Sequence, residues 1–115
     1  MNYLHTIRII HRDLKSANIL VTQNFVVKIS DFGESRLIDN EMTIVGSQFW
    51  IAPEIIMGEG YNEKADVFSF GIVLAEMELH DKPYSGYNHH HIYIHLLNPI
   101  LFVTLTVTLI LTLNT

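Results

Sequence analysis

His11-Arg12-Asp13-Leu14-Lys15-Ser16-Ala17-Asn18 opens the stretch that decides the fold, and Asp31-Phe32-Gly33 closes it. Between them, apolar runs at 19–21 and 25–29 flank a polar turn at 22–24, a pattern that predicts a two-stranded hairpin. A hairpin brings its ends together, so we expect Asp13, Asn18 and Asp31 to converge at one edge, with the Lys15 cation beside them. Carboxylate and carboxamide oxygens suit hard cations. The stretch therefore predicts a metal- and phosphate-binding site on loops beside the hairpin.

The order and spacing of these motifs resemble those of protein kinases. The five-position gap from Asp13 to Asn18 and the Asp-Phe-Gly at 31–33 match the catalytic and metal-binding loops of that family. Ala-Pro-Glu at 52–54 follows in the family's order, and 66–71 looks like its central buried helix. Over residues 1–88 the chain resembles a eukaryotic-type protein kinase, most closely the tyrosine-kinase-like group of serine/threonine kinases.

The resemblance implies a fold as well as a family. It implies an α+β fold that corresponds to part of the large, C-terminal lobe of the kinase domain, mainly helical with a short β-hairpin. A helix is expected at 52–58, with Pro53 in its first turn and Gly58 as its stop. A second helix is expected at 63–79, capped by Asn62, and its lack of a polar stripe predicts burial on all sides.

The polar residues of the two loops receive chemical roles from the resemblance. Asp13 would be the base that orients and accepts the proton of a substrate hydroxyl, and Lys15 would steady the transferring phosphoryl group. Asn18 and Asp31 would hold Mg²⁺. Leu20 would form part of the floor beneath adenine, although a core leucine explains it equally well. ATP and Mg²⁺ are thus the implied cofactors, and a protein is the implied substrate.

Activation-segment residues are implied to regulate the site. Arg12 would receive a phosphate from this segment, and an ordinary surface ion pair is the alternative. Thr43 is the candidate phosphosite, because a phosphate there could pair with Arg12 and order the loop. Ser47 would instead contact Asp13 and Lys15. For both hydroxyls the alternative is a hydrogen bond to their own backbone.

The remaining implied residues support the loops. Phe32 would pack under Asp31, and Gly33 would allow the backbone to flip. Asp66 would hold the catalytic-loop backbone by hydrogen bonds, since a buried acid without such partners would be costly. His11 and Glu54 complete the set as members of the motifs. Each of these residues, taken alone, is explained equally well as an ordinary loop or core residue. The kinase roles are assigned because all of the motifs occur together and in order.

Length, charge and cysteine content restrict the function classes. The chain has 115 residues and a net charge of −5, so it offers no basic surface for nucleic acid. It has no cysteine, which excludes disulfides, thiolate zinc sites and a cysteine nucleophile and fits a cytoplasmic protein. A complete kinase domain is far longer. We expect a fragment that lacks the small lobe, with its Gly-rich loop and strand lysine.

The segment 89–115 departs from the kinase pattern. No Asp, Glu, Lys or Arg occurs from Pro83 onward, and the histidines at 89–91 and 95 suit a low-complexity run better than a metal site. The apolar stretch 92–113 approaches membrane-spanning length, but Pro99 and its threonines make membrane contact marginal. We expect an unrelated apolar tail.

Three functional hypotheses follow. The leading one is a protein serine/threonine kinase that transfers the γ-phosphoryl group of ATP to Ser and Thr hydroxyls; Lys15 favours this specificity, since tyrosine kinases usually carry an arginine and an Ala-Ala pair nearby. The second is a catalytically inactive kinase-like fragment that binds a partner. The third is an inert product with an aggregating or membrane-inserting tail. A Gly-rich loop in the reading frame upstream of Met1 would distinguish a complete kinase from the other two.

Overall fold

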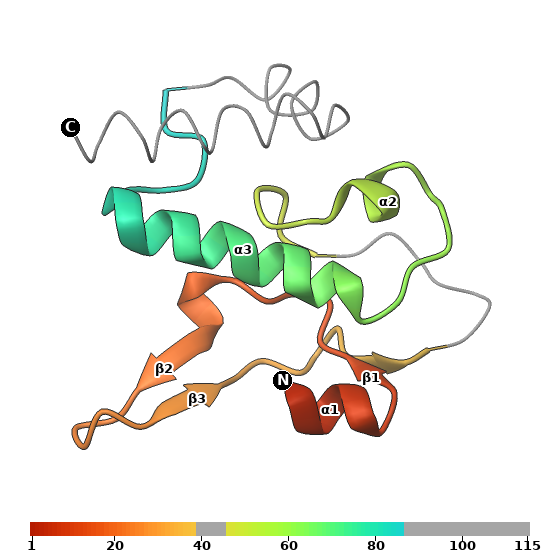
Figure 1. The fold of residues 1–115 in the computed structure, drawn as a ribbon, viewed down its shortest axis with the longest axis horizontal. Helices are drawn as coiled ribbons and strands as arrows, with labels where there is room; N and C mark the ends of the chain where they lie inside the picture. Colours follow the sequence, from red (N-terminus) through yellow and green to blue (C-terminus); the bar gives the residue numbers. More distant parts are fainter. Residues whose placement is uncertain (39–45, 87–115) are drawn as a thin grey trace. The chain divides into compact units, whose positions relative to one another are not determined.

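The computed structural model describes residues 1–38 and 46–86 (Figure 1), and the chain divides into two units, residues 1–83 and the remainder from 84 onward. Every helix and strand described here belongs to the first unit. In chain order they are α1 (Asn2–Thr6), β1 (Ile9–Ile10), the 3-10 turn η1 (Ser16–Asn18), β2 (Ile19–Val21), β3 (Val27–Ile29), β4 (Arg36–Leu37), α2 (Pro53–Ile56) and α3 (Lys64–Leu79). The unit confirms the predicted small α+β fold with a short hairpin. Residues 39–45, which include Thr43, and the tail 89–115 lie outside the described residues.

The predicted hairpin forms from β2 and β3, which pair antiparallel with Ile19 opposite Ile29 (Figure 1). Its turn closes on Thr22, whose amide donates to Val26 O at 3.0 Å and whose hydroxyl accepts from Val26 N at 3.1 Å. At the other end, Ser30 N donates to Asn18 O at 2.9 Å. The hairpin thus places the chain just before Asp31 against the end of the catalytic-loop motif.

A second strand pair was not anticipated. The polar sequence of residues 34–50 predicts a loop, but β4 pairs antiparallel with β1, with Ile10 opposite Arg36. Two-residue strands carry no alternation that a sequence pattern could reveal. The apolar residues before the catalytic loop also differ from one another, since Ile10 is fully buried whereas Ile7 is 43% exposed. The apolar, β-branched residues at 7, 9 and 10 predict core positions, and this prediction is wrong for Ile7.

Helix α2 begins with Pro53 in its first turn, as predicted, because proline's fixed φ suits that position. It ends before Gly58, whose φ of +70° is the left-handed conformation that glycine adopts without strain. Helix α3 begins at Lys64, one residue later than predicted. Its N-cap is therefore Glu63, without a side-chain cap hydrogen bond, and not Asn62 as predicted. Asn62 lies one residue earlier, where its side chain accepts from Lys64 N at 3.0 Å.

The prediction that α3 is buried on all sides is wrong. Its buried residues are Ala65, Asp66, Ser69, Ile72 and Val73. They recur at helical spacing and so form one face. The opposite side exposes Val67, Phe70, Leu74 and Met77, with exposed fractions of 45 to 66%. An apolar composition makes a helix fit for burial, but burial also needs packing partners, and within the first unit these lie against one face only.

The core joins the elements that carry the motifs. It consists of Ile10 from β1, Ala52 and Ile55 at α2, Tyr61 from the following loop and Ala65 from α3. Ile38, Ile51 and Phe68 pack around it. Because β1 leads directly into the catalytic-loop motif, the core fixes that motif against α3. None of the helices in the described ranges has the length and apolar character needed to cross a membrane.

Candidate active site

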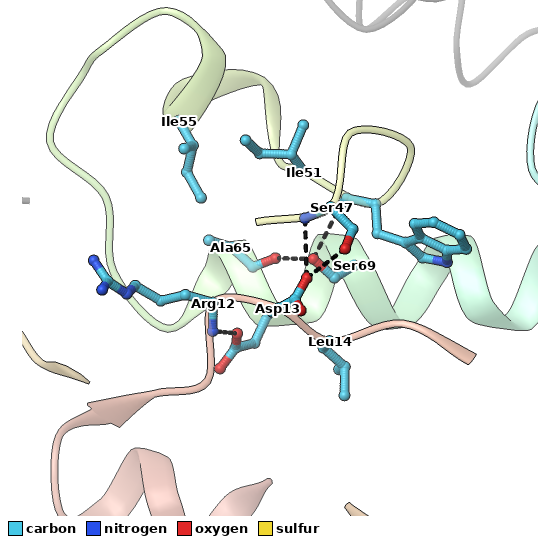
Figure 2. A pocket seen from close by; sticks show the side chains of 10 residues that line it. Arg12, Asp13, Leu14, Ser47, Ile51, Ile55, Ala65 and Ser69 are labelled. Carbon is cyan, nitrogen blue, oxygen red and sulfur yellow. Dashed lines mark hydrogen bonds between the residues drawn. The ribbon is translucent and has the colours of Figure 1, made fainter. Parts of the chain in front are cut away.

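The Asp13 carboxylate is the centre of a compact polar cluster (Figure 2). Its Oδ1 accepts hydrogen bonds from Ser47 N at 2.9 Å and from Ser47 Oγ at 2.6 Å. Lys15 Nζ lies 3.3 Å from Asp13 Oδ2 and donates to Ser47 Oγ at 2.6 Å. The predicted contacts of Ser47 with Asp13 and Lys15 are therefore confirmed. Charge-assisted bonds of this kind fix the carboxylate in one orientation.

Asp66 holds the backbone of the same loop by hydrogen bonds from α3. It lies in the first turn of α3 and is 1% exposed. Its two oxygens accept the amides of His11 at 2.9 Å and Arg12 at 3.0 Å, and His5 Nε2 lies 2.8 Å from Oδ2. The N-terminal end of a helix also favours a negative charge. These contacts confirm the prediction that Asp66 holds the catalytic-loop backbone by hydrogen bonds.

His11 links the two loops. It is fully buried, its Nε2 lies 2.9 Å from Ser30 O, and its Nδ1 accepts from Asp13 N at 3.2 Å. These partners assign the proton to Nε2, which donates to the Ser30 carbonyl. The Phe32 ring meets the imidazole edge-on, with centroids 5.0 Å apart. Movement of the Asp-Phe-Gly loop would therefore shift the His11 ring and, through it, the backbone amide of Asp13.

Asn18 and Asp31 are the two predicted metal ligands. Asn18 is 6% exposed and its Nδ2 donates to Asp13 O at 2.8 Å, which leaves its amide oxygen as the group available to a cation. Asp31 is exposed, with φ of +62°, and its Oδ1 accepts weakly from Gly33 N at 3.4 Å. Within residues 1–38 and 46–86, no three His, Asp or Glu side chains form a metal cluster. The oxygen donors present suit Mg²⁺, which is commonly held by few protein ligands together with water and phosphate oxygens.

Two glycines shape these loops. Gly46 has a φ of +117°, and a Cβ built on it would lie 2.8 Å from Arg12 O. Glycine thus allows the segment before Ser47 to approach the catalytic loop. Near Gly33 the left-handed conformation falls instead on Asp31, two residues earlier, and an added Cβ at Gly33 would lie 3.3 Å from Asp31 Oδ1.

The remaining predicted site residues, Arg12, Leu20 and Glu54, lie outside the Asp13 cluster. The Arg12 guanidinium donates to Glu34 O through Nε and to Tyr61 OH through Nη1 at 3.1 Å. The predicted phosphate contact of Arg12 stays a prediction, because Thr43 lies outside the described residues. Leu20 is 51% exposed on β2, so the core alternative does not describe it. Glu54 lies, partly buried, in the first turn of α2.

A crevice beside Asp13 is too narrow to hold a water molecule. Figure 2 shows side chains from the catalytic loop, the segment after Gly46 and α3 around it. Its lining includes Asp13, Ser47, Asp66 and Ser69. The crevice is the packed junction that holds the loops together and offers no room for a ligand.

Sequence reasoning missed a second junction between the loops and α3. Ser69 Oγ donates to Trp50 O at 2.7 Å, and Glu76 accepts from Trp50 Nε1 at 2.8 Å and from Ser16 Oγ at 2.9 Å. The available signal was the spacing of Asp66, Ser69 and Glu76, which puts three polar residues within about 80° of one another around an otherwise apolar helix. Such a polar stripe indicates a face that binds loops.

Comparison with known proteins agrees with this geometry. The family model described as "Protein kinase domain" matches residues 1–113. A probable serine/threonine-protein kinase of Dictyostelium discoideum is 52% identical over 89 residues, which cover 75% of this chain and 10% of that protein. The dual specificity protein kinase shkD of the same organism is 48% identical over 98 residues, covering 81% of this chain and 13% of the relative.

A mammalian relative is similar to the same degree. Mitogen-activated protein kinase kinase kinase 12 of Rattus norvegicus is 51% identical over 87 residues, covering 73% of this chain and 10% of that protein. The chain thus spans about a tenth of the length of these relatives. With its motifs in order, its Asp13 cluster assembled and a family model matched over residues 1–113, the chain belongs to the protein kinase domain family.

Proposed function

We propose that this chain supplies the catalytic and metal-binding loops of a protein serine/threonine kinase, which transfers the γ-phosphoryl group of ATP to protein Ser and Thr hydroxyls. The observation that carries the proposal is the arrangement of Asp13. One carboxylate oxygen is fixed by Ser47, the other faces the Lys15 ammonium, and Asp66 accepts the two preceding backbone amides, those of His11 and Arg12. A fixed carboxylate beside a cation can orient an incoming hydroxyl and accept its proton.

Each proposed role follows from where the group sits. Asp13 receives the proton of the substrate hydroxyl, and Lys15 places a positive charge next to the group that is transferred. Asn18 and Asp31 would hold Mg²⁺, which supplies charge neutralisation on the phosphates when bound. Proton acceptance, orientation and positive charge are the parts of the reaction that this chain's own side chains provide.

In family terms, we propose that residues 1–88 correspond to part of the large lobe. Support comes from the hairpin between the two loops, the short helix α2 that carries Pro53 and Glu54, and the Asp66 contacts from α3. The boundary at residue 88 stays a prediction. The family match continues to residue 113, whereas the three relatives named above align over 87 to 98 residues.

The proposal is tested in a chimera in which residues 1–88 replace the matched segment of rat mitogen-activated protein kinase kinase kinase 12. With Mg·ATP and a protein substrate, we expect labelled phosphate on serine and threonine. Phosphoamino-acid analysis separates this outcome from labelling of tyrosine, which would contradict the proposed specificity. A folded chimera that binds Mg·ATP and transfers no phosphate would contradict the proposed chemistry.

The 115-residue chain by itself should not phosphorylate a generic acidic or basic protein. Upstream of His11 its sequence holds neither a Gly-rich loop nor a strand lysine to grip the phosphates, and positioning provides most of the catalysis in phosphoryl transfer. The measurement is label incorporation by purified chain with Mg·ATP. Incorporation that disappears in the Asp13→Asn and Asp31→Ala variants would show this prediction to be wrong.

Residues 1–88 should be more soluble than the full chain. The segment 92–113 contains no charged residue and is mostly apolar, so it adds surface that favours association in water. Sedimentation of both forms, with and without liposomes, measures the difference. Equal solubility, with residues 92–113 protected from protease in detergent-free buffer, would contradict the prediction that this segment is foreign to the domain.

A further inference from the structure

Glu76 joins two segments that are far apart in the sequence. It lies on α3 and is partly buried. Its Oε1 accepts from Ser16 Oγ at 2.9 Å, and its Oε2 accepts from Trp50 Nε1 at 2.8 Å. Ser16 follows Lys15 in the catalytic loop, and Trp50 closes a turn with Ser47 through the bond from Trp50 N to Ser47 O at 3.0 Å. Both oxygens of the carboxylate are therefore used, one for each segment.

The turn 47–50 is consequently held at both ends. At one end Ser47 donates twice to Asp13 Oδ1. At the other end Trp50 is held by α3 twice, through its carbonyl, which accepts from Ser69 Oγ at 2.7 Å, and through its indole, which donates to Glu76. A short turn fixed at its far end has few conformations left for its near end. The Glu76 contact should therefore help to decide whether Ser47 reaches Asp13.

The chemistry of the contact favours a specific role over a chance surface pair. An indole N–H can only donate, so a partly buried tryptophan needs an acceptor. Glu76 supplies a charged one, and a hydrogen bond to a charged acceptor is stronger than one between neutral groups. The second oxygen is taken by Ser16, so the carboxylate orientation is fixed by partners from two loops.

We propose that Glu76 is a positioning residue, which ties the turn 47–50 to the catalytic loop and thereby keeps Ser47 on Asp13. The proposal rests on the proposed function, because the loop that it positions is the one that holds the proposed base. Glu76 acts through Trp50 and Ser16 and is not a catalytic residue.

The full-length chain tests the proposal without any assay of phosphate transfer. Its single tryptophan gives one indole N–H resonance, and hydrogen exchange at the Ser47 amide reports the bond to Asp13. In Glu76→Ala we expect the indole resonance to move upfield and the Ser47 amide to exchange on the order of tenfold faster, as loss of a charged hydrogen-bond partner implies. Glu78→Ala, at an exposed position of the same helix, should change neither.

Two further variants keep the test decisive if Glu76→Ala unfolds. Glu76→Gln should retain both signals, because its amide oxygen can accept from the indole while its NH₂ donates to Ser16 Oγ. Trp50→Phe keeps the ring and removes the donor, so it should accelerate Ser47 exchange as Glu76→Ala does. A shifted indole resonance with unchanged Ser47 exchange would show that Glu76 anchors Trp50 alone, and an unmoved resonance would show that the bond is absent; both results overturn the proposal. Because the assay reads hydrogen bonds, its outcome is separate from that of the chimera.

Discussion

Asp66→Ala should lower the free energy of unfolding by about 3–5 kcal/mol, the range for removing one partner of a buried charged network. Asp66 is 1% exposed and accepts the amides of His11 and Arg12, with His5 also in contact. Alanine would leave these donors without their acceptor at a buried position. Helix propensity cannot produce this loss, because alanine is the better helix former and its contribution has the opposite sign.

The measurement is the urea unfolding of residues 1–88, monitored through the fluorescence of Trp50. Glu78→Ala is the matched control, an acidic residue of the same helix at an exposed position, and should change stability by no more than about 0.5 kcal/mol. Asp66→Asn should fall between the two, since its single amide oxygen cannot accept from all the partners. A loss below about 1 kcal/mol in Asp66→Ala would contradict the assigned clamp, because it lies under the range expected for such a site.

Asp13→Ala should reduce phosphate transfer by the chimera roughly 10²–10⁴-fold, the usual contribution of a positioned acid or base. Its carboxylate is held by Ser47 and faces Lys15, and no other acceptor in the cluster can take the substrate proton. Asp13→Asn should behave similarly, because it retains the shape and loses the basicity. The transfer rate at saturating Mg·ATP measures the effect, and Glu78→Ala serves again as the control. A transfer rate reduced by less than tenfold would contradict the assignment of Asp13 as the base.

Local patterns predicted local structure. The hairpin β2–β3 formed because alternating apolar runs on both sides of a polar turn specify both strands and their register. The start of α2 followed from Pro53. The contacts of Ser47 and Asp66 were also predicted, but from the resemblance to kinases; the residues alone supply no reason for a bond between positions 34 or 55 apart in the chain.

The features that were missed depend on long-range packing. Apolar composition showed that α3 could be buried all round, yet Val67 and Met77 are 61% and 66% exposed because burial depends on which partners are present. The strand β4 is two residues long and exists through its pairing with β1. The Trp50–Glu76 bond joins residues 26 apart. A polar residue in an apolar helix indicates a partner, but not which one.

The most direct test of the central claim, that these loops are those of a working kinase, compares two constants in one chimera. The rate of phosphate transfer and the dissociation constant of Mg·ATP are measured for the parent, Asp13→Ala and Asp31→Ala. We expect Asp13→Ala to lose transfer and keep nucleotide affinity, because in its proposed role as base it touches the substrate hydroxyl. Asp31→Ala should weaken Mg·ATP binding, because its proposed role is to hold the metal. Weakened binding in Asp13→Ala with intact binding in Asp31→Ala would contradict the account.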